Sequence, residues 1–198
     1  MDDKTPKQRR TILILGGARS GKSDYAQSLA AKLSSNVLYV ATATAQDEEM
    51  AERIVRHRAS RPARWDTLEV PLGVAAALRE GIGGYDVVLI DCLTLLASNI
   101  LLRYERRPDL AEAALLAELD EIFTLCEAAG VTLIIVSNEV GMGVVPPYPL
   151  GRYYRDLLGR ANQRVAKRAD HVLLLIAGLP VDIKALSGKV PLWNGDRE

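Results

Sequence analysis

The sequence predicts an α/β fold in which a mostly parallel β-sheet carries helices on both faces and gains a hairpin strand near its C-terminal end. Two observations lead to this prediction. Short, almost unbroken apolar runs recur along the chain, as in strands buried on both faces, and segments with apolar residues at helical spacing alternate with them. With 198 residues, of which 48% are hydrophobic and 25% charged, the chain has a globular composition. One domain is expected at residues 11–186, between a flexible leader at 1–10 and a tail at 187–198.

Three strands and two helices are predicted in the first third of the chain. Residues 11–15 (TILIL) and 37–41 (VLYVA) are apolar, β-rich runs, the first of which stops at a pair of glycines. Between them, residues 22–33 place Tyr, Ala and Leu at helical spacing. Residues 47–58 have apolar residues on one side and begin with three acidic residues, which suit the positive end of a helix. Residues 67–70 predict a short strand.

The middle of the chain continues the alternation. Residues 74–80 predict a short helix that ends at a group of glycines, and 86–91 (DVVLID) predict a strand with a carboxylate at its end. Two helices are expected at 93–103 and 110–129, with a proline between them and a glycine closing the second. Residues 131–137 (VTLIIVS) form the next apolar strand.

The last third begins with a Gly/Pro-rich loop at 141–149, too broken for regular structure. Residues 152–168 predict a strongly basic helix and 171–177 a strand. A turn at 178–180 is expected to lead into 181–186 as the returning strand of a hairpin. Lys plus Arg and Asp plus Glu are 25 each, so the net charge is zero, and the basic helix is interpreted as a solvated cover of the sheet, with no nucleic-acid partner.

The most specific motif follows the first predicted strand. The segment GGARSGKS fits GxxxxGK[ST] in full, between an apolar strand and an amphipathic helix. Its glycines let backbone N–H groups surround phosphate oxygens at a helix N-terminus, while the lysine reaches the β- and γ-phosphates and the last hydroxyl is a ligand for Mg²⁺. The sequence therefore predicts a P-loop NTPase domain of the RecA-like kind, with Lys22 also acting in catalysis. The predicted nucleotide-binding residues are Gly16, Gly17, Ala18, Arg19, Ser20, Gly21, Lys22 and Ser23.

Asp91, the last residue of DVVLID, is the candidate partner of this loop. A carboxylate at the end of a second apolar strand can hold Mg²⁺ together with Ser23 and bind the nucleotide through it. The alternative is that Asp91 caps the helix that begins near residue 93. Kinases, GTPase switches and motor ATPases share these features, and the absence of the guanine-reading NKxD motif argues against a conventional GTPase switch.

His57 is one of only two histidines and lies among Arg53, Arg56, Arg58 and Arg61. Arginines in this position can grip phosphates, and they favour a neutral imidazole, which is a competent nucleophile toward phosphorus. The other interpretation is a solvated basic helix end whose cations complement the helix dipole. The second histidine, His171, opens a strand and is interpreted as structural.

Beyond these motifs, the sequence resembles the bifunctional adenosylcobinamide kinase/adenosylcobinamide-phosphate guanylyltransferase family of cobalamin biosynthesis. The resemblance covers most of the chain and depends on an ordered set of segments, whereas a P-loop alone is common to many families. The matching segments are GGARSGKS (16–23), VLYVATA (37–43), DEEMAERIVRHRASRPARW (47–65), SNEVGMGVVP (137–146), LGRYYRDLLGRANQRVAKRAD (150–170) and GLPVDIK (178–184).

The resemblance implies two reactions. Adenosylcobinamide is first phosphorylated from ATP or GTP, and GMP is then transferred from GTP onto that phosphate, through a GMP attached to histidine, giving adenosylcobinamide-GDP and pyrophosphate. The family's motif carries the covalent role onto His57. It also implies that Thr42, Arg58, Arg61 and Glu69 contact the nucleotide, and that the loop from Ser137 to Val145 lies beside the site.

The resemblance further implies a homotrimer. The two cysteines, Cys92 and Cys126, have neither disulfide-framework nor metal-site spacing, so a cytoplasmic enzyme is expected, and no apolar run is long enough for a membrane span.

Two alternative functions remain at this point. One is a P-loop ATPase or GTPase switch without covalent guanylylation, and the other is a kinase alone. The intact His57 segment argues against the second.

Overall fold

The structure is a computed structural model that describes residues 9–44, 48–59 and 61–188. The predicted leader at 1–10 and tail at 187–198 therefore lie largely outside the described residues. The strands are β1 (Thr11–Gly16), β2 (Val37–Ala41), β3 (Asp66–Glu69), β4 (Val87–Asp91), β5 (Thr132–Asn138), β6 (His171–Ile176) and β7 (Leu179–Asp182). The helices are α1 (Lys22–Leu33), α2 (Glu48–Ala59), α3 (Val74–Gly81), α4 (Leu93–Arg103), α5 (Pro108–Ala129), α6 (Pro149–Arg168) and α7 (Ile183–Ser187).

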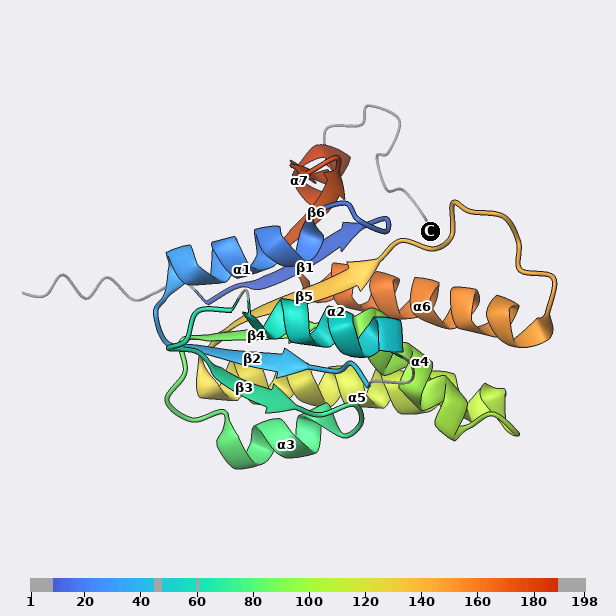
Figure 1. Cartoon of the computed structure of the whole chain (residues 1–198), viewed down its shortest axis with the longest axis horizontal. Helices are drawn as coiled ribbons and strands as arrows, with labels where there is room; N and C mark the ends of the chain where they lie inside the picture. The colour runs from blue at the N-terminus through green and yellow to red at the C-terminus, as the bar shows by residue number, and fades with distance from the viewer. Residues whose placement is uncertain (1–8, 45–47, 60, 189–198) are drawn as a thin grey trace, which may run out of the picture.

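The seven strands form one sheet in the order β3-β2-β4-β5-β1-β6-β7, in which every pair is parallel except β6–β7 (Figure 1). One strand, β5, lies between β1 and β4. The parallel strands end at the same edge, where β1 leads into the P-loop and β4 ends in Asp91. This arrangement confirms the predicted α/β architecture, including the antiparallel strand near the C-terminal end.

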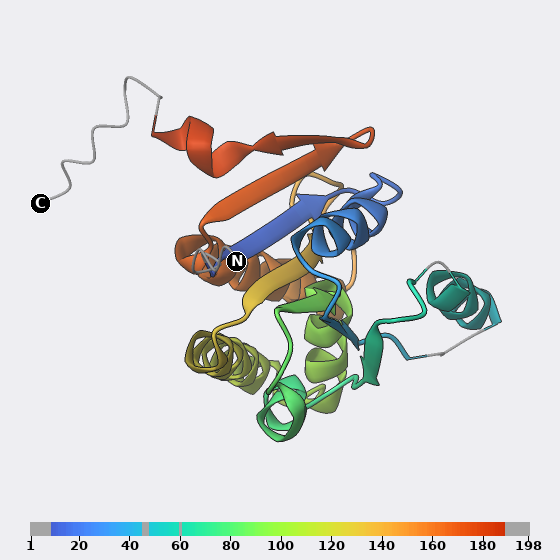
Figure 2. The same cartoon turned by 90° about the vertical axis from the view of Figure 1, so that its left-hand side faces the viewer.

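Helices cover both faces of the sheet. Figure 2 shows α1 on one side and α3 to α6 on the other, with α2 set apart from the sheet on the α1 side. The apolar side chains of β1 alternate between these layers, since Ile12 and Ile14 join the α1 cluster and Leu13 and Leu15 join the opposite one. All four are buried, as expected for a strand in the middle of a sheet covered on both faces.

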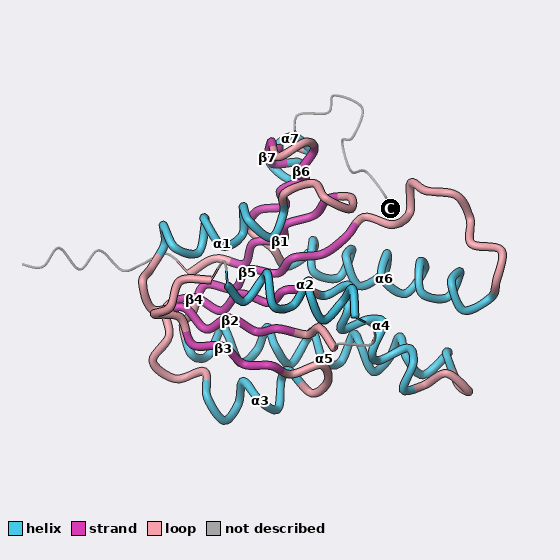
Figure 3. The backbone as a smooth tube through the Cα atoms, in the orientation of Figure 1, coloured by secondary structure: helices cyan, strands magenta, loops and turns pink. Residues whose placement is uncertain are grey.

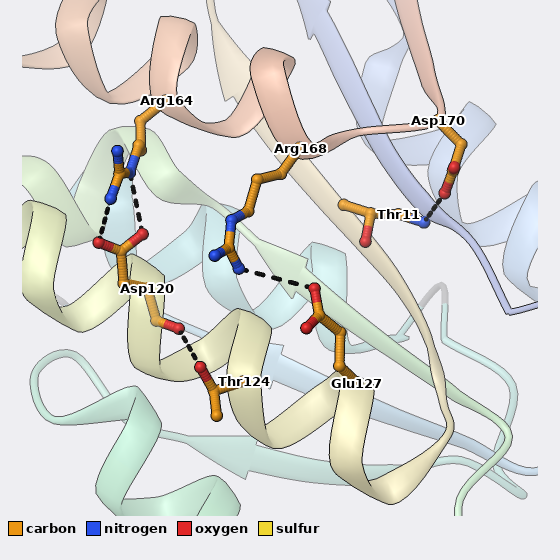
Figure 4. Close-up of polar contacts among 7 residues, drawn as sticks. All are labelled: Thr11, Asp120, Thr124, Glu127, Arg164, Arg168 and Asp170. Carbon is orange, nitrogen blue, oxygen red and sulfur yellow. Dashed lines mark hydrogen bonds and ion pairs between the residues drawn. The ribbon is translucent and has the colours of Figure 1, made fainter.

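The basic helix α6 packs beside α5, and charged side chains link the two helices (Figure 4). Arg164 forms a bidentate pair with Asp120, with its Nε 2.9 Å from Oδ1, and Arg168 lies 3.6 Å from Glu127. Hydrogen bonds from Arg164 lower the pKa of the Asp120 carboxyl. Several basic residues of α6 therefore have acidic partners within the fold.

The predicted hairpin return at 181–186 is only partly correct. The turn occupies Ala177 and Gly178, which both have positive φ, 51° and 81°, so β7 begins earlier than predicted. The strand stops at Asp182 because its carboxylate accepts a hydrogen bond from the backbone N–H of Ala185 at 3.1 Å and caps α7. The apolar residues that follow belong to this short helix.

Two helix boundaries also differ from the prediction, because each begins at a proline. Pro108 and Pro149 occupy the first positions of α5 and α6, where a missing N–H costs no hydrogen bond. In the described ranges, no helix combines the length and the apolar character that crossing a bilayer requires.

Two glycines in different surroundings provide a test of this backbone. Gly130 ends α5 with φ 75°, and an added Cβ would also meet the side chain of Arg9, whereas a Cβ at Gly159 within α6 would meet nothing within 4 Å. Gly130→Ala is expected to lower the free energy of unfolding by about 1–2 kcal/mol, the cost of the left-handed conformation. Gly159→Ala is expected to raise it by about 1 kcal/mol, the difference in helix propensity. Urea denaturation measures the free energy of unfolding of both variants. Changes of the same sign would contradict the conformations described for the two glycines.

Candidate active site

The P-loop connects β1 to α1 and depends on close packing at Gly16. A Cβ built there would collide with Ser20 Oγ and lie 2.9 Å from the carbonyl oxygen of Leu175, so no larger residue fits without a shift. Arg19 and Gly21 have positive φ, 56° and 85°, which turns the chain sharply into the first turn of α1. The backbone therefore curls around the N-terminus of α1, the arrangement that binds phosphate in P-loops.

Neighbouring segments hold the loop in this shape. The Lys22 side chain folds back across it, with Nζ donating to the carbonyl of Gly17 at 3.0 Å. The β6–β7 turn closes against the far side, since the N–H of Gly178 donates to the carbonyl of Ser20 at 3.0 Å. Glu139, just beyond β5, donates its N–H to the carbonyl of Gly16 at 3.2 Å. The predicted phosphate-binding residues 17–19 stay exposed on the remaining side.

Asp91 lies opposite Ser23, although their strands are not neighbours. Helix α1 crosses over β5 and contacts β4, which brings the start of the helix to the end of that strand. Ser23 Oγ donates to Asp91 Oδ1 at 3.4 Å, and the N-cap position of α4 is occupied by Cys92. The alternative role of Asp91 as the cap of α4 is therefore wrong.

The second carboxylate oxygen of Asp91 is bound by Tyr39, whose hydroxyl donates to Oδ2 at 2.7 Å. Burial raises the pKa of Tyr39 above its ordinary value, and the charge of Asp91 and this hydrogen bond raise it further. Tyr39 therefore remains a donor at physiological pH. The guanidinium of Arg61 lies over the Tyr39 ring, 3.8 Å from its centroid. Sequence reasoning missed Tyr39, although a single hydroxyl within the apolar run VLYVA is an available signal.

A pocket of about 480 Å³ opens beside Arg61, the residue that stacks on Tyr39. Its lining includes three of the predicted nucleotide contacts, Arg58, Arg61 and Glu69, together with the mostly buried Trp65. Arg58, on α2, pairs with Glu69, at the end of β3, and its Nε lies 2.7 Å from Oε1. The Nε and Nη1 atoms of Arg61 are buried and have no hydrogen-bond partner among the described residues. The pocket thus combines a guanidinium held by a carboxylate with one that has two nitrogens without a hydrogen-bond partner among the described residues.

Thr42 differs from the other predicted contacts because its hydroxyl is already satisfied. Oγ1 donates to the carbonyl of Cys92 at 2.7 Å and accepts from the N–H of the same residue at 2.9 Å. The side chain is fully buried, and Asn99 donates to the Thr42 carbonyl at 2.9 Å. Through these hydrogen bonds with Cys92, Thr42 joins the end of β2 to the end of β4.

His57 lies near the C-terminal end of α2, one residue before Arg58. Its side chain is outside the part of the chain that the structure describes, so its place is known from the helix alone. The structure brings together the P-loop, Asp91, Arg61, Arg58 and Glu69 along the carboxyl ends of the strands and the adjoining α1 face. The functional roles of these residues stay predictions.

The groups present suit a magnesium–nucleotide complex. A hydroxyl and a carboxylate meet at Ser23 and Asp91, and such oxygen donors are the ligands that Mg²⁺ prefers, with the remaining positions filled by water and phosphate. Among residues 9–44, 48–59 and 61–188, no group of three or more His, Cys, Asp or Glu side chains forms a closed metal cage. Two protein ligands are typical of a site completed by a nucleotide.

The loop that follows β5 extends from the same edge of the sheet (Figure 3). Met142 and Val144 are 81% and 96% exposed there, and Val145 and Tyr148 are also exposed. The loop predicted to lie beside the site thus carries several exposed apolar side chains.

Comparisons with known proteins agree with the motifs. A family described as cobinamide kinase / cobinamide phosphate guanyltransferase matches residues 12–183. The chain is 48% identical to the bifunctional adenosylcobalamin biosynthesis protein CobP of Pseudomonas aeruginosa, over 87% of this chain and 96% of the relative. It is 41% identical to the corresponding CobU of Escherichia coli, over 87% and 99%. Among solved structures, an ATPase domain aligns with a TM-score of 0.48 at 13% identity, over 85% of this chain and 69% of that one.

The packing at Gly16 generates a test of the loop. Gly16→Ala is expected to weaken nucleotide binding by more than about tenfold, or 1.4 kcal/mol, because Ser20 and the backbone of Leu175 must move apart. Gly83→Ala is the matched control, since a Cβ there meets nothing within 4 Å. Titration with a fluorescent GTP analogue measures the nucleotide affinity of both variants. Wild-type affinity in Gly16→Ala would show that the loop does not need this close approach.

Proposed function

The chain belongs to the cobinamide kinase / cobinamide phosphate guanyltransferase family, and from this premise we propose how its residues carry out the family's two reactions. The protein is an enzyme of adenosylcobalamin biosynthesis. We propose adenosylcobinamide and its phosphate as acceptors, with ATP or GTP as phosphoryl donor and GTP as guanylyl donor. The observation that supports this scheme best is that the P-loop, Asp91 and the pocket lined by Arg58 and Glu69 lie near one another.

In the proposed first reaction, the terminal hydroxyl of adenosylcobinamide attacks the γ-phosphorus of the nucleotide. A new O–P bond forms, the bond between the γ-phosphorus and the β-phosphate oxygen breaks, the hydroxyl proton passes to water, and a nucleoside diphosphate leaves. Lys22 and the loop N–H groups bind the β- and γ-phosphates and stabilise the charge that develops on them. Such a transfer depends mainly on positioning and electrostatics, so the chain needs no dedicated strong base.

In the proposed second reaction, a neutral nitrogen of His57 attacks the α-phosphorus of GTP. An N–P bond forms, the bond between the α-phosphorus and the bridging oxygen breaks, and pyrophosphate leaves on the P-loop. The phosphate of the acceptor then attacks the GMP carried by His57, which restores the histidine and gives adenosylcobinamide-GDP. The position of His57 on α2, next to a pocket residue, supports this assignment.

We assign Arg58, Arg61 and Glu69 to the nucleotide in this scheme. The buried guanidinium nitrogens of Arg61 that have no partner among the described residues suit an anion, and a guanidinium can bind two phosphate oxygens at once. Arg58 is held by Glu69, which limits the loss of side-chain freedom when a nucleotide binds. Because the Thr42 hydroxyl is already bonded to Cys92, we assign Thr42 to the frame of the site and not to a side-chain hydrogen bond with the nucleotide.

Ser23 and Asp91 are the proposed ligands of Mg²⁺. Held there, the ion would supply positive charge that offsets the negative charge developing in both transfers. We also propose that Asp91 orients the acceptor hydroxyl. The hydroxyl groups of Ser23 and Tyr39 hold its carboxylate near the loop in the free protein.

Two finer features complete the proposal. Both cysteines are free, which supports a reducing compartment such as the cytoplasm. The exposed apolar side chains Ile176, Leu179, Met142 and Val144 support assembly into a homo-oligomer, with a trimer as the expected state.

Covalent labelling tests the histidine mechanism. The protein incubated with Mg²⁺ and GTP labelled at the α-phosphate is expected to retain label after denaturation, whereas γ-labelled GTP leaves none. The bond should be labile in acid and stable in alkali, as a phosphoramidate is. His57→Ala should abolish the label.

The other histidine supplies the matched control. His171 contacts Asp182 at 2.8 Å at the opposite end of the sheet, so His171→Ala should keep the label. A folded, GTP-binding wild type without α-label would exclude covalent guanylylation. Transfer of γ-label to adenosylcobinamide in that case would leave a kinase alone, and hydrolysis without transfer would leave a nucleotide switch.

A further inference from the structure

Tyr39 lies inside the sheet with its hydroxyl directed at the candidate metal ligand. Its side chain is 1% exposed, and it belongs to the apolar cluster on the α1 face. In the parallel pairing of β2 with β4, Tyr39 aligns with Leu89 and Ala41 aligns with Asp91. Because side chains alternate along a strand, Tyr39, Leu89 and Asp91 point to the same face. Tyr39 thus reaches diagonally across the pair of strands to Asp91.

The Asp91 carboxylate is held at both oxygens by hydroxyl groups. Ser23 donates to Oδ1 at 3.4 Å, a long hydrogen bond, and Tyr39 donates to Oδ2 at 2.7 Å, a short one to a charged acceptor. The Ser23 hydroxyl is itself the other candidate metal ligand. Tyr39 is therefore the partner that stays in place when a cation takes up the space between Ser23 and Asp91.

The Tyr39 ring is fixed from its other side by Arg61. The guanidinium stacks 3.8 Å from the ring centroid and also lines the pocket of about 480 Å³. A ring that is packed in the core and covered by a cation has little freedom to rotate away from its acceptor. The phenol oxygen therefore has a fixed position from which it donates to the Asp91 carboxylate.

We propose that Tyr39 is a positioning residue that orients the Asp91 carboxylate so that Oδ1 faces the cation bound with the nucleotide. The inference rests on the proposed function, because it assumes that Asp91 and Ser23 hold Mg²⁺. Without the phenol donor, the carboxylate can turn about its terminal torsion and satisfy Oδ2 elsewhere. Asp91 then remains a ligand, but orienting it costs binding free energy.

Direct titration of a metal tests this role. Mn²⁺ is added to the protein with a non-hydrolysable GTP analogue, and free Mn²⁺ is followed by electron paramagnetic resonance. Tyr39→Phe keeps the ring and its contact with Arg61 but removes the hydroxyl. We expect the apparent Kd for Mn²⁺ to rise roughly tenfold, the effect of losing one hydrogen bond to a charged group. The affinity for the analogue without metal should change by less than about twofold, because Tyr39 contacts no phosphate in this arrangement.

Tyr85→Phe is the matched control. The Tyr85 hydroxyl also donates to a carboxylate, Asp66 Oδ2 at 2.9 Å, but at the opposite end of the sheet. Tyr85→Phe should leave the apparent Kd for Mn²⁺ unchanged. A similar loss of metal affinity in both variants, or none in Tyr39→Phe while thermal unfolding shows both proteins folded, would overturn the positioning role.

Asp91→Asn separates this inference from the function beneath it. If Asp91→Asn weakens Mn²⁺ binding and Tyr39→Phe does not, only the role of Tyr39 fails. If Asp91→Asn binds Mn²⁺ as wild type does, the proposed metal site itself is wrong. In the kinase assay, saturating Mg²⁺ should restore the turnover of Tyr39→Phe, which a general loss of structure would not allow.

Discussion

The parallel register of β2, β4, β5 and β1 places the elements of the candidate active site at one edge of the sheet. Gly16 aligns with Asn138, and Asp91 aligns with Val136 on one side and Ala41 on the other. A shift of β4 by one residue would turn Asp91 to the opposite face, where the apolar layer of α3 to α6 packs. A carboxylate there would be buried without a partner, which is costly. The apolar alternation of the strands therefore fixes where the charged groups lie.

Hydrogen bonds between polar side chains and loop backbone then hold the strand ends in place. Thr42 joins the ends of β2 and β4, and Thr94, on α4, accepts from the N–H of Asn138 at 2.8 Å. Asn162, on α6, accepts from Ser137 at 2.7 Å and donates to the Asn138 carbonyl at 3.0 Å. Because these partners are buried or half-buried, each lost bond leaves an unsatisfied group, and the network keeps the edge rigid. A preformed edge spares the nucleotide the cost of ordering it.

Sequence patterns of a few residues were enough to predict the features whose signals are local. The strands, the P-loop and Asp91 each have a signal within a few residues, so their positions follow from the sequence. The hydroxyl of Tyr39 stands out in the apolar run VLYVA, but its acceptor could not be assigned, because Asp91 lies on β4, which is distant in the sequence. The early end of β7 was missed because Asp182 can continue a strand or cap a helix equally well until the next turn is seen. The pairing of Arg58 with Glu69 could not be predicted either, because the carboxylate comes from the end of β3, a separate element.

One phosphate loop can serve both proposed reactions because the charge it must stabilise is similar. In γ-phosphoryl transfer, charge develops on the oxygen between the β- and γ-phosphates, and in guanylyl transfer it develops on the pyrophosphate that leaves. In the proposed scheme, Lys22 and the N-terminus of α1 stabilise both groups. What must differ is the nucleophile, which approaches in line from beyond the γ-phosphate in one case and from the nucleoside side in the other. The proposed scheme therefore assigns the pocket beside Arg61 and Glu69, with α2 carrying His57, to the second reaction, and it requires a separate approach to the loop for the acceptor hydroxyl of the first.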